Sequence, residues 1–276
     1  MTQLEKSLAT IARKAAAVAA MLADPESNRA ALIRFIADSY SFHKSGKIED
    51  IFSLDVASRK CSFCDAMREA AKANPAIICK YCYARQEHES AQARHEITGN
   101  ILQTIRITPE EAAYITPPTA AIVRFNSDGE ILNDIHADNL LTIAKATPNT
   151  TFAIWTKRPE LLNKAITRAG GKPENLIAGI SSPQINVTTA PYSWTDFVFT
   201  VYTPAGITRA LARDEFPCNG KKCKECGFRC YRKPANTAGP VYVAEALRKP
   251  HDLKKAEFIE LCKTIDEITL KEDWTV

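Results

Sequence analysis

Eight of the nine cysteines fall in two short blocks, and this grouping constrains the chain more than any other feature of its sequence. The first block runs from Lys60 to Arg85, and the second lies within residues 218–230. Two thiolates separated by two residues reach one metal from a single turn of backbone, so the pattern indicates metal ligation. The candidate ligands are Cys61, Cys64, Cys79 and Cys82 in the first block and Cys218, Cys223, Cys226 and Cys230 in the second.

Three kinds of bond compete for these thiols. Disulfides are poorly supported, because no convincing secretory segment precedes the blocks and adjacent Cys-x-x-Cys pairs are poor staples in a chain of this size. The first block, Cys-x2-Cys-x14-Cys-x2-Cys, lies near the spacing of a four-cysteine zinc site. In the second block, Cys-x4-Cys-x2-Cys matches the spacing of plant-type ferredoxins, with Cys230 as a fourth ligand. Spacing alone therefore leaves zinc and iron both open.

Composition limits the class of protein. The 276 residues suit one large domain with appendages, and 45% hydrophobic with 25% charged residues is ordinary for a globular protein with a full core. A net charge of +4 is compatible with an anionic ligand or nucleic acid and is evidence for neither. No run of eighteen apolar residues occurs, so we expect no membrane span and a cytoplasmic location, where thiols stay reduced.

Both ends of the chain read as helical. Leu4, Leu8, Ile11, Ala15, Val18 and Leu22 form the stripe of an amphipathic helix over residues 1–23, and a second helix is expected over 26–40. We therefore expect a helical appendage over residues 1–45, a main unit over 46–250 and a C-terminal helix over 251–276. Cys262 is expected to be a core thiol of that last helix.

The main unit alternates strands with helices. Strands are expected at residues 51–56, 121–126, 151–157, 177–182, 197–203 and 240–246, and helices at 84–105, 108–114, 131–146 and 159–169. Strands that are apolar on both faces and separated by helices indicate a parallel sheet buried between layers. The predicted fold is an α/β, partial (β/α)6 barrel of the TIM type with a Cys-rich insertion near its C-terminus. An open doubly wound sheet is the alternative.

In such folds the chemistry lies at the carboxyl ends of the strands. This rule selects Asn126, Ser127, Asp128, Gly129, Glu130, Lys157, Ser181, Ser182, Tyr202, Thr203 and Glu245. Strand alternation points Arg124 into the barrel, where it needs a carboxylate such as Glu245 or an anionic ligand. His88 and His95 lie seven residues apart in a polar stretch, which favours a solvated helix face over ligation.

Four segments together resemble the radical S-adenosylmethionine enzymes, and more closely a set of phage-encoded proteins with that layout. They are CKYCYAR at 79–85, VRFNSDGEILN at 123–133, FAIWTKRPELL at 152–162 and CNGKKCKECGFRCY at 218–231. The resemblance implies that three cysteines hold a 4Fe-4S cluster whose open iron binds S-adenosylmethionine. An electron from a reductant protein then releases a 5′-deoxyadenosyl radical that abstracts hydrogen from a substrate that the sequence does not identify. The second block would hold an auxiliary cluster.

The resemblance also implies roles for residues. Cys79 and Cys82 would be cluster ligands, with the third upstream at Cys61 or Cys64, and Cys61 is favoured because it lies nearest the strand end. Tyr81 or Tyr83 would pack near the adenine, and the turn Asp128-Gly129-Glu130 would bind the methionine amino group. The predicted cofactor-binding set is Tyr81, Tyr83, Asn126, Ser127, Asp128, Gly129, Glu130 and Ser181, and the predicted catalytic residues are Glu130, Arg124 and Lys157.

A rival interpretation is a zinc-stabilised binding module. It would use basic residues around the second block to bind nucleic acid, although a solvated loop explains them as well. These residues are Lys221, Lys222, Lys224, Arg229, Arg232 and Lys233. Anaerobic expression separates the alternatives, because an iron–sulfur protein is brown and a zinc protein is colourless.

Overall fold

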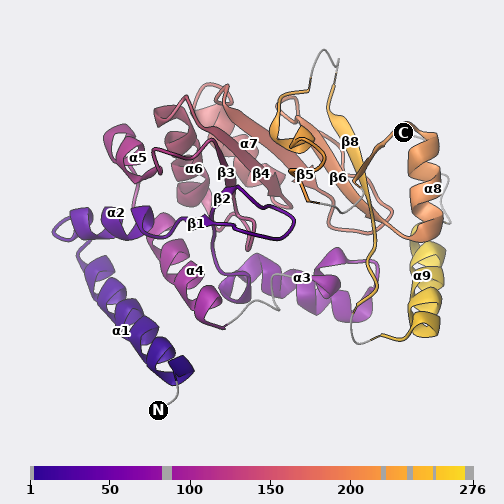
Figure 1. Cartoon of the computed structure of the whole chain (residues 1–276), viewed down its shortest axis with the longest axis horizontal. Helices are drawn as coiled ribbons and strands as arrows, with labels where there is room; N and C mark the ends of the chain where they lie inside the picture. Colours follow the sequence, from indigo (N-terminus) through magenta and orange to yellow (C-terminus); the bar gives the residue numbers. More distant parts are fainter. Residues whose placement is uncertain (1–2, 83–88, 219–221, 235–238, 251–252, 271–276) are drawn as a thin grey trace.

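The six predicted strands all form, and they lie side by side in one parallel sheet (Figure 1). They are β2 Phe52–Leu54, β3 Ile122–Phe125, β4 Thr151–Thr156, β5 Leu176–Ser181, β6 Phe197–Tyr202 and β8 Val241–Ala246. Two short edge strands were not predicted: β1 Ser41–Phe42, antiparallel to β2, and β7 Phe216–Cys218, parallel to β8. The computed structural model describes residues 3–82, 89–218, 222–234, 239–250 and 253–270.

The sheet is open. Its strand order is β1-β2-β3-β4-β5-β6-β8-β7, and in the part of the chain that the structure describes its two edge strands do not pair with each other. The predicted closure toward a barrel is therefore not seen, while the mixed α/β class and the sequential parallel order are. Two or three residues of β1 and β7 are too few to carry a sheet around into a closed ring.

Nine α-helices accompany the sheet in the described residues. They are α1 Gln3–Ala23, α2 Arg29–Ala37, α3 Ser62–Ala73, α4 Glu89–Leu102, α5 Pro109–Ile115, α6 Asp134–Ala146, α7 Pro159–Arg168, α8 Pro204–Ala212 and α9 Lys255–Thr269. Figure 1 shows α1 and α2 at one end of the molecule and α8 and α9 together at the other. The helices α3 and α8 were not predicted. No described helix is long and apolar enough to cross a membrane.

The two faces of the sheet are covered differently. On one face, Val123, Phe125 and Phe152 join the large core formed with α4 to α7, and the rings of Phe125 and Phe152 stack with centroids 4.9 Å apart. On the opposite face, a smaller cluster around Ala153 and Tyr231 includes three cysteines of the second block. The second block thus covers the face that α4 to α7 leave open.

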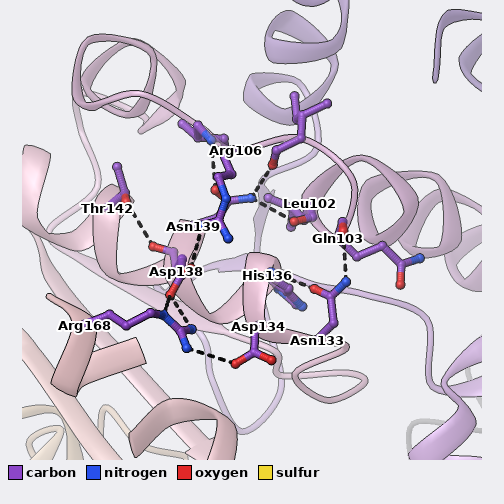
Figure 2. Close-up of polar contacts among 12 residues, drawn as sticks. Leu102, Gln103, Arg106, Asn133, Asp134, His136, Asp138, Asn139, Thr142 and Arg168 are labelled. Carbon is purple, nitrogen blue, oxygen red and sulfur yellow. Dashed lines mark hydrogen bonds and ion pairs between the residues drawn. The ribbon is translucent and has the colours of Figure 1, made fainter. Parts of the chain in front are cut away.

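Polar contacts fasten α6 to the segment 102–106 and to α7 (Figure 2). Asn139 donates to the carbonyl oxygens of Leu102 and Ile105 at 2.8 and 2.7 Å, and Asn133 donates to that of Gln103 at 2.9 Å. Arg168 of α7 reaches the α6 carboxylate of Asp138 at 2.6 Å. These contacts hold the start of α6, and with it the preceding turn, in one position.

His136, on the first turn of α6, should make stability fall in acid. Burial lowers the pKa of His136 to about 3, and the positive charge of Arg158 adds to the effect. The unfolded chain takes up a proton below pH about 6.5, whereas the folded chain does not until about pH 3, so stability is present above 6.5 and is lost as the pH falls. Between pH 6.5 and 5 this group should cost about 2 kcal/mol.

Denaturant unfolding at pH 7, 6 and 5 measures this loss. The variant His136→Asn keeps an acceptor for the Leu132 amide, which the imidazole Nδ1 now accepts at 3.2 Å, but cannot be protonated. It should start less stable and lose less stability between pH 6.5 and 5. Parallel pH profiles for the two proteins would contradict the assignment to His136.

Candidate functional site at the carboxyl ends of β2 to β4

Glu130 is a buried tie between the ends of β3 and β4. Its side chain accepts hydrogen bonds from the amides of Ile131 at 3.0 Å and Lys157 at 2.8 Å and from the hydroxyl of Thr156, and the residue is 3% exposed. Arg158, at the start of α7, donates to the carbonyl oxygens of Ile131 and Leu132 at 2.7 and 2.9 Å. The turn after β3 is therefore clamped to the start of α7.

The carboxylate of Asp128 is hydrogen-bonded through only one of its two oxygens in the described residues. Its Oδ2 accepts from the Gln92 amide and lies 3.1 Å from Nδ1 of His95, while its Oδ1 has no hydrogen-bond partner among the described residues. His95 is 8% exposed, so the expected solvated face is wrong for this histidine; His88 lies outside the described residues. Oδ1 of Asp128 is therefore a buried, strong acceptor that no described residue satisfies.

Asp55, which directly follows β2, anchors the same turn. Its Oδ1 accepts from the Ser127 hydroxyl at 2.8 Å and from the Asp128 amide at 3.1 Å. Its Oδ2 accepts from the Ser53 hydroxyl at 2.5 Å, and that hydroxyl lies 2.8 Å from Nε2 of His43. Sequence reasoning missed Asp55, although a polar residue at the end of a buried strand is the signal that selected its neighbours.

Gly129 sits where a side chain has no room. Its φ is +78°, and a Cβ at this position would lie 2.1 Å from the carbonyl oxygen of Val56. Glycine is therefore required both by the left-handed backbone and by the close approach of the segment after β2. This contact brings the segment that leads to the first cysteine block against the turn.

The first cysteine block lies beside this turn. Cys61 is the N-cap residue of α3 and is 1% exposed, Cys64 lies in the first turn of that helix, and Cys79 lies in the short helix Ile78–Tyr81. A hydrogen bond from the Cys64 thiol and the backbone amides of Phe63 and Cys64 lower the pKa of Cys61 to about 7, against the effect of burial. These donors favour the thiolate form of Cys61.

Lys157 ends β4 and links the block to Glu130. Burial alone would lower the pKa of Lys157, but the negative charges of Cys79, Glu130, Cys82 and Cys64 outweigh it and raise the pKa. Burial raises the pKa of Cys79, and Lys157 opposes that shift. Lys157 is therefore a cation within electrostatic reach of thiols from both Cys-x-x-Cys pairs.

The remaining predicted cofactor residues are less informative. The Tyr81 hydroxyl donates to the carbonyl oxygen of Pro75 at 3.0 Å, and burial raises the pKa of Tyr81 to about 12. Ser181 ends β5 and is half-buried. Tyr83 lies outside the described residues.

The second cysteine block is tied to the loop before β2. The Cys223 amide donates to the Lys47 carbonyl oxygen at 2.7 Å, and the Lys47 ammonium lies 2.8 Å from Glu245. Burial and the nearby charges of Cys218, Cys226 and Cys223 raise the pKa of Cys230 to about 12. The other three thiols of the block therefore lie within electrostatic reach of Cys230.

The expected ion pair between Arg124 and Glu245 does not form. The Arg124 guanidinium stacks over the Trp155 ring, 4.3 Å from the ring centroid, and donates to the Tyr231 hydroxyl at 3.2 Å. Glu245 pairs with Lys47 and Arg248, and four strand-to-strand steps separate β3 from β8 in the open sheet. Arg124 instead joins the centre of the sheet to the residue that follows Cys230.

In the part of the chain that the structure describes, the cysteine sulfur atoms of each block lie in one region, but they do not surround a common point. Among the described residues, no group of three or more His, Cys, Asp or Glu side chains is arranged to hold a metal ion. The donor set itself fits a thiophilic metal, since each block supplies four cysteines and the first is accompanied by the cation Lys157.

The basic residues around the second block are partly neutralised. Lys222 pairs with Glu49, and Lys224 lies 2.5 Å from Asp50. Arg229 lies over the Phe216 ring, 5.1 Å from its centroid, and Lys221 is outside the described residues. These pairs reduce the positive field that a phosphate backbone would meet.

A family model described as gene product 88 matches residues 36–232, which is more than half of the 276 residues. The chain belongs to the gene product 88 family. That description suggests a phage-type protein family, in keeping with the resemblance to phage-encoded proteins. The match includes both cysteine blocks and the turn after β3. No curated protein and no solved structure matches the chain at a significant level.

Proposed function

We propose that this protein is an iron–sulfur protein of the radical S-adenosylmethionine type, with a 4Fe-4S cluster at the first block and an auxiliary cluster at the second. The observation that supports the proposal is that Lys157, within electrostatic reach of thiols from both Cys-x-x-Cys pairs, lies beside the clamped turn at the carboxyl ends of parallel strands. When bound, the cluster and S-adenosylmethionine supply hydrogen abstraction by a 5′-deoxyadenosyl radical, with an electron from a reductant protein.

Different residues would bind the cluster, compensate its charge and contact the amino group of S-adenosylmethionine. Cys79, Cys82 and Cys61 would hold the cluster, and Cys61 is favoured over Cys64 because it lies nearer the end of β2. Lys157 would offset the charge of the thiolates. Asp128 supports the amino-group role better than Glu130 does, because its Oδ1 has no partner among the described residues, whereas Glu130 already accepts three hydrogen bonds.

Single alanine variants of Cys61 and Cys64 test the proposal. After anaerobic expression, iron and sulfide are measured together with the change in the visible spectrum on adding S-adenosylmethionine. Cys61→Ala should lose the first cluster, while Cys64→Ala should keep it and keep the spectral response, since three ligands leave one iron open. Cys262→Ala, which removes a buried thiol of α9 outside both blocks, is the matched control.

Two results would count against the proposal. A colourless wild-type protein that contains zinc would favour the zinc-stabilised module. A brown protein whose spectrum ignores S-adenosylmethionine would favour a fully cysteine-ligated centre with an electron-transfer or structural role.

A further inference from the structure

Asn126 buries a carboxamide that the described residues leave unsatisfied. The residue follows β3 directly and is 4% exposed, and neither its Oδ1 nor its Nδ2 has a hydrogen-bond partner among the described residues. A buried amide without partners is costly, and native structures contain few of them. Since no described residue supplies a partner, the carboxamide is a candidate for contact with a bound ligand.

The backbone alone does not explain this asparagine. Its φ is +50°, a conformation that asparagine tolerates better than most residues but that glycine adopts without burying any polar group. Glycine is used in that way at Gly129, three residues later, where φ is +78°. An asparagine chosen only for its φ would carry an avoidable desolvation cost.

The carboxamide is presented from a rigid support. The Asn126 amide donates to the Leu54 carbonyl oxygen at 3.0 Å, and the next two residues are held by Asp55. A side chain on such a fixed backbone loses little freedom when a ligand binds, which is the usual design of a recognition residue.

The chemistry of the carboxamide defines its ligand. It offers one acceptor beside one donor, so its complement is a donor beside an acceptor. An ammonium group supplies only donors and a carboxylate only acceptors, and either would leave half of the amide unsatisfied. The amino group and adjacent ring nitrogen of adenine supply both, and asparagine pairs with them in two parallel hydrogen bonds.

We propose that Asn126 recognises the adenine of the bound nucleoside cofactor through its amino group and an adjacent ring nitrogen. The inference rests on the proposed function, because S-adenosylmethionine is the ligand that brings an adenine to this edge of the sheet. It gives Asn126 a base-reading role, distinct from the roles of Asp128 in the amino-group contact and of Tyr81 beside the ring.

Calorimetry with adenosine and purine riboside tests the proposal on the anaerobic, iron-loaded protein. Purine riboside lacks only the amino group, so it keeps the ring and the ribose while removing the donor. The wild type should bind adenosine about tenfold tighter or more. In Asn126→Gly, which suits the left-handed backbone, the ratio of the two affinities should fall to about one while the unfolding midpoint stays the same or rises.

Asn186 provides a matched control. It also has a left-handed backbone, with φ +64°, but its carboxamide accepts from the Thr203 amide and donates to Asp266, both at 2.9 Å. Asn186→Gly should lower the unfolding midpoint and leave the affinity ratio unchanged. The two variants thus separate a recognition role from a structural one.

The outcomes distinguish this inference from the proposed function. It is overturned if the wild type binds both nucleosides equally or if Asn126→Gly keeps the wild-type ratio, and a spectral response to S-adenosylmethionine would then leave the radical proposal standing. If the ratio collapses in Asn126→Gly while the cluster spectrum ignores S-adenosylmethionine, the adenine contact is supported and the radical proposal fails.

Discussion

Gly129→Ala should abolish most of the stability of the fold, whereas Gly170→Ala should cost about 1 kcal/mol. Both glycines have a left-handed backbone, with φ +78° and +75°. A Cβ at Gly170 meets nothing within 4 Å, but one at Gly129 would lie 2.1 Å from the carbonyl oxygen of Val56 and 2.7 Å from its Cγ2. Backbone atoms cannot move aside as a flexible side chain can, so the turn and the segment after β2 must separate.

Denaturant unfolding of both variants measures the difference. We expect Gly129→Ala to lose about 4 kcal/mol or more, which places it among the most damaging single substitutions. Because the backbone penalty is shared, the excess over Gly170→Ala reports the steric contact alone. Equal losses for the two variants would show that the segment around Val56 yields, and the tight joint between β2 and the turn would then be wrong.

The double variant Cys223→Ala/Cys226→Ala should lose about half of the bound iron and keep the rest. The two blocks lie in different surroundings: Cys64 and Cys79 lie near Lys157 at the strand ends, whereas Cys223 lies near Lys47 and packs on the face of the sheet with Tyr231. Each centre should therefore assemble without the other.

Iron and sulfide per chain are measured beside the unfolding midpoint, with Cys262→Ala as the control for losing a thiol outside the blocks. The remaining iron should still respond to S-adenosylmethionine. Complete loss of iron from a folded double variant would instead argue for one site shared by both blocks.

Strand positions were predictable because a buried parallel strand leaves a strong local pattern. All six apolar runs became strands, in sequential order, and the turn at 126–130 emerged at the expected edge. Helix α8 was not predicted, although its start has a recognisable signal. Thr203 caps it through the Gly206 amide at 3.1 Å, and Pro204 occupies its first turn. Helix α3 was not predicted because the Cys-x-x-Cys spacing was interpreted as metal ligation, although the residues around these cysteines favour a helix.

Long-range partners were not predictable from local pattern. The contact of His95 with Asp128 joins residues 33 positions apart on a helix and a turn, and a polar helix face gives no sign of which side chain will meet it. The pairing of Arg124 with Glu245 required a closed barrel; in the open sheet four strand spacings, about 19 Å, lie between β3 and β8. The assumption that the sheet closes into a barrel thus led to the wrong partner for Arg124.

The strand order β6-β8-β7 has a consequence for how the chain matures. β7, which ends at Cys218, is made before β8, yet in the described residues it pairs only with β8. A nascent chain that has reached the second cysteine block therefore carries a strand with no neighbour until residues 241–246 have been synthesised and inserted beside β6. Because such non-local pairing forms late, the first cysteine block can reach its final surroundings on a growing chain, whereas the second must wait for nearly the whole protein to emerge from the ribosome.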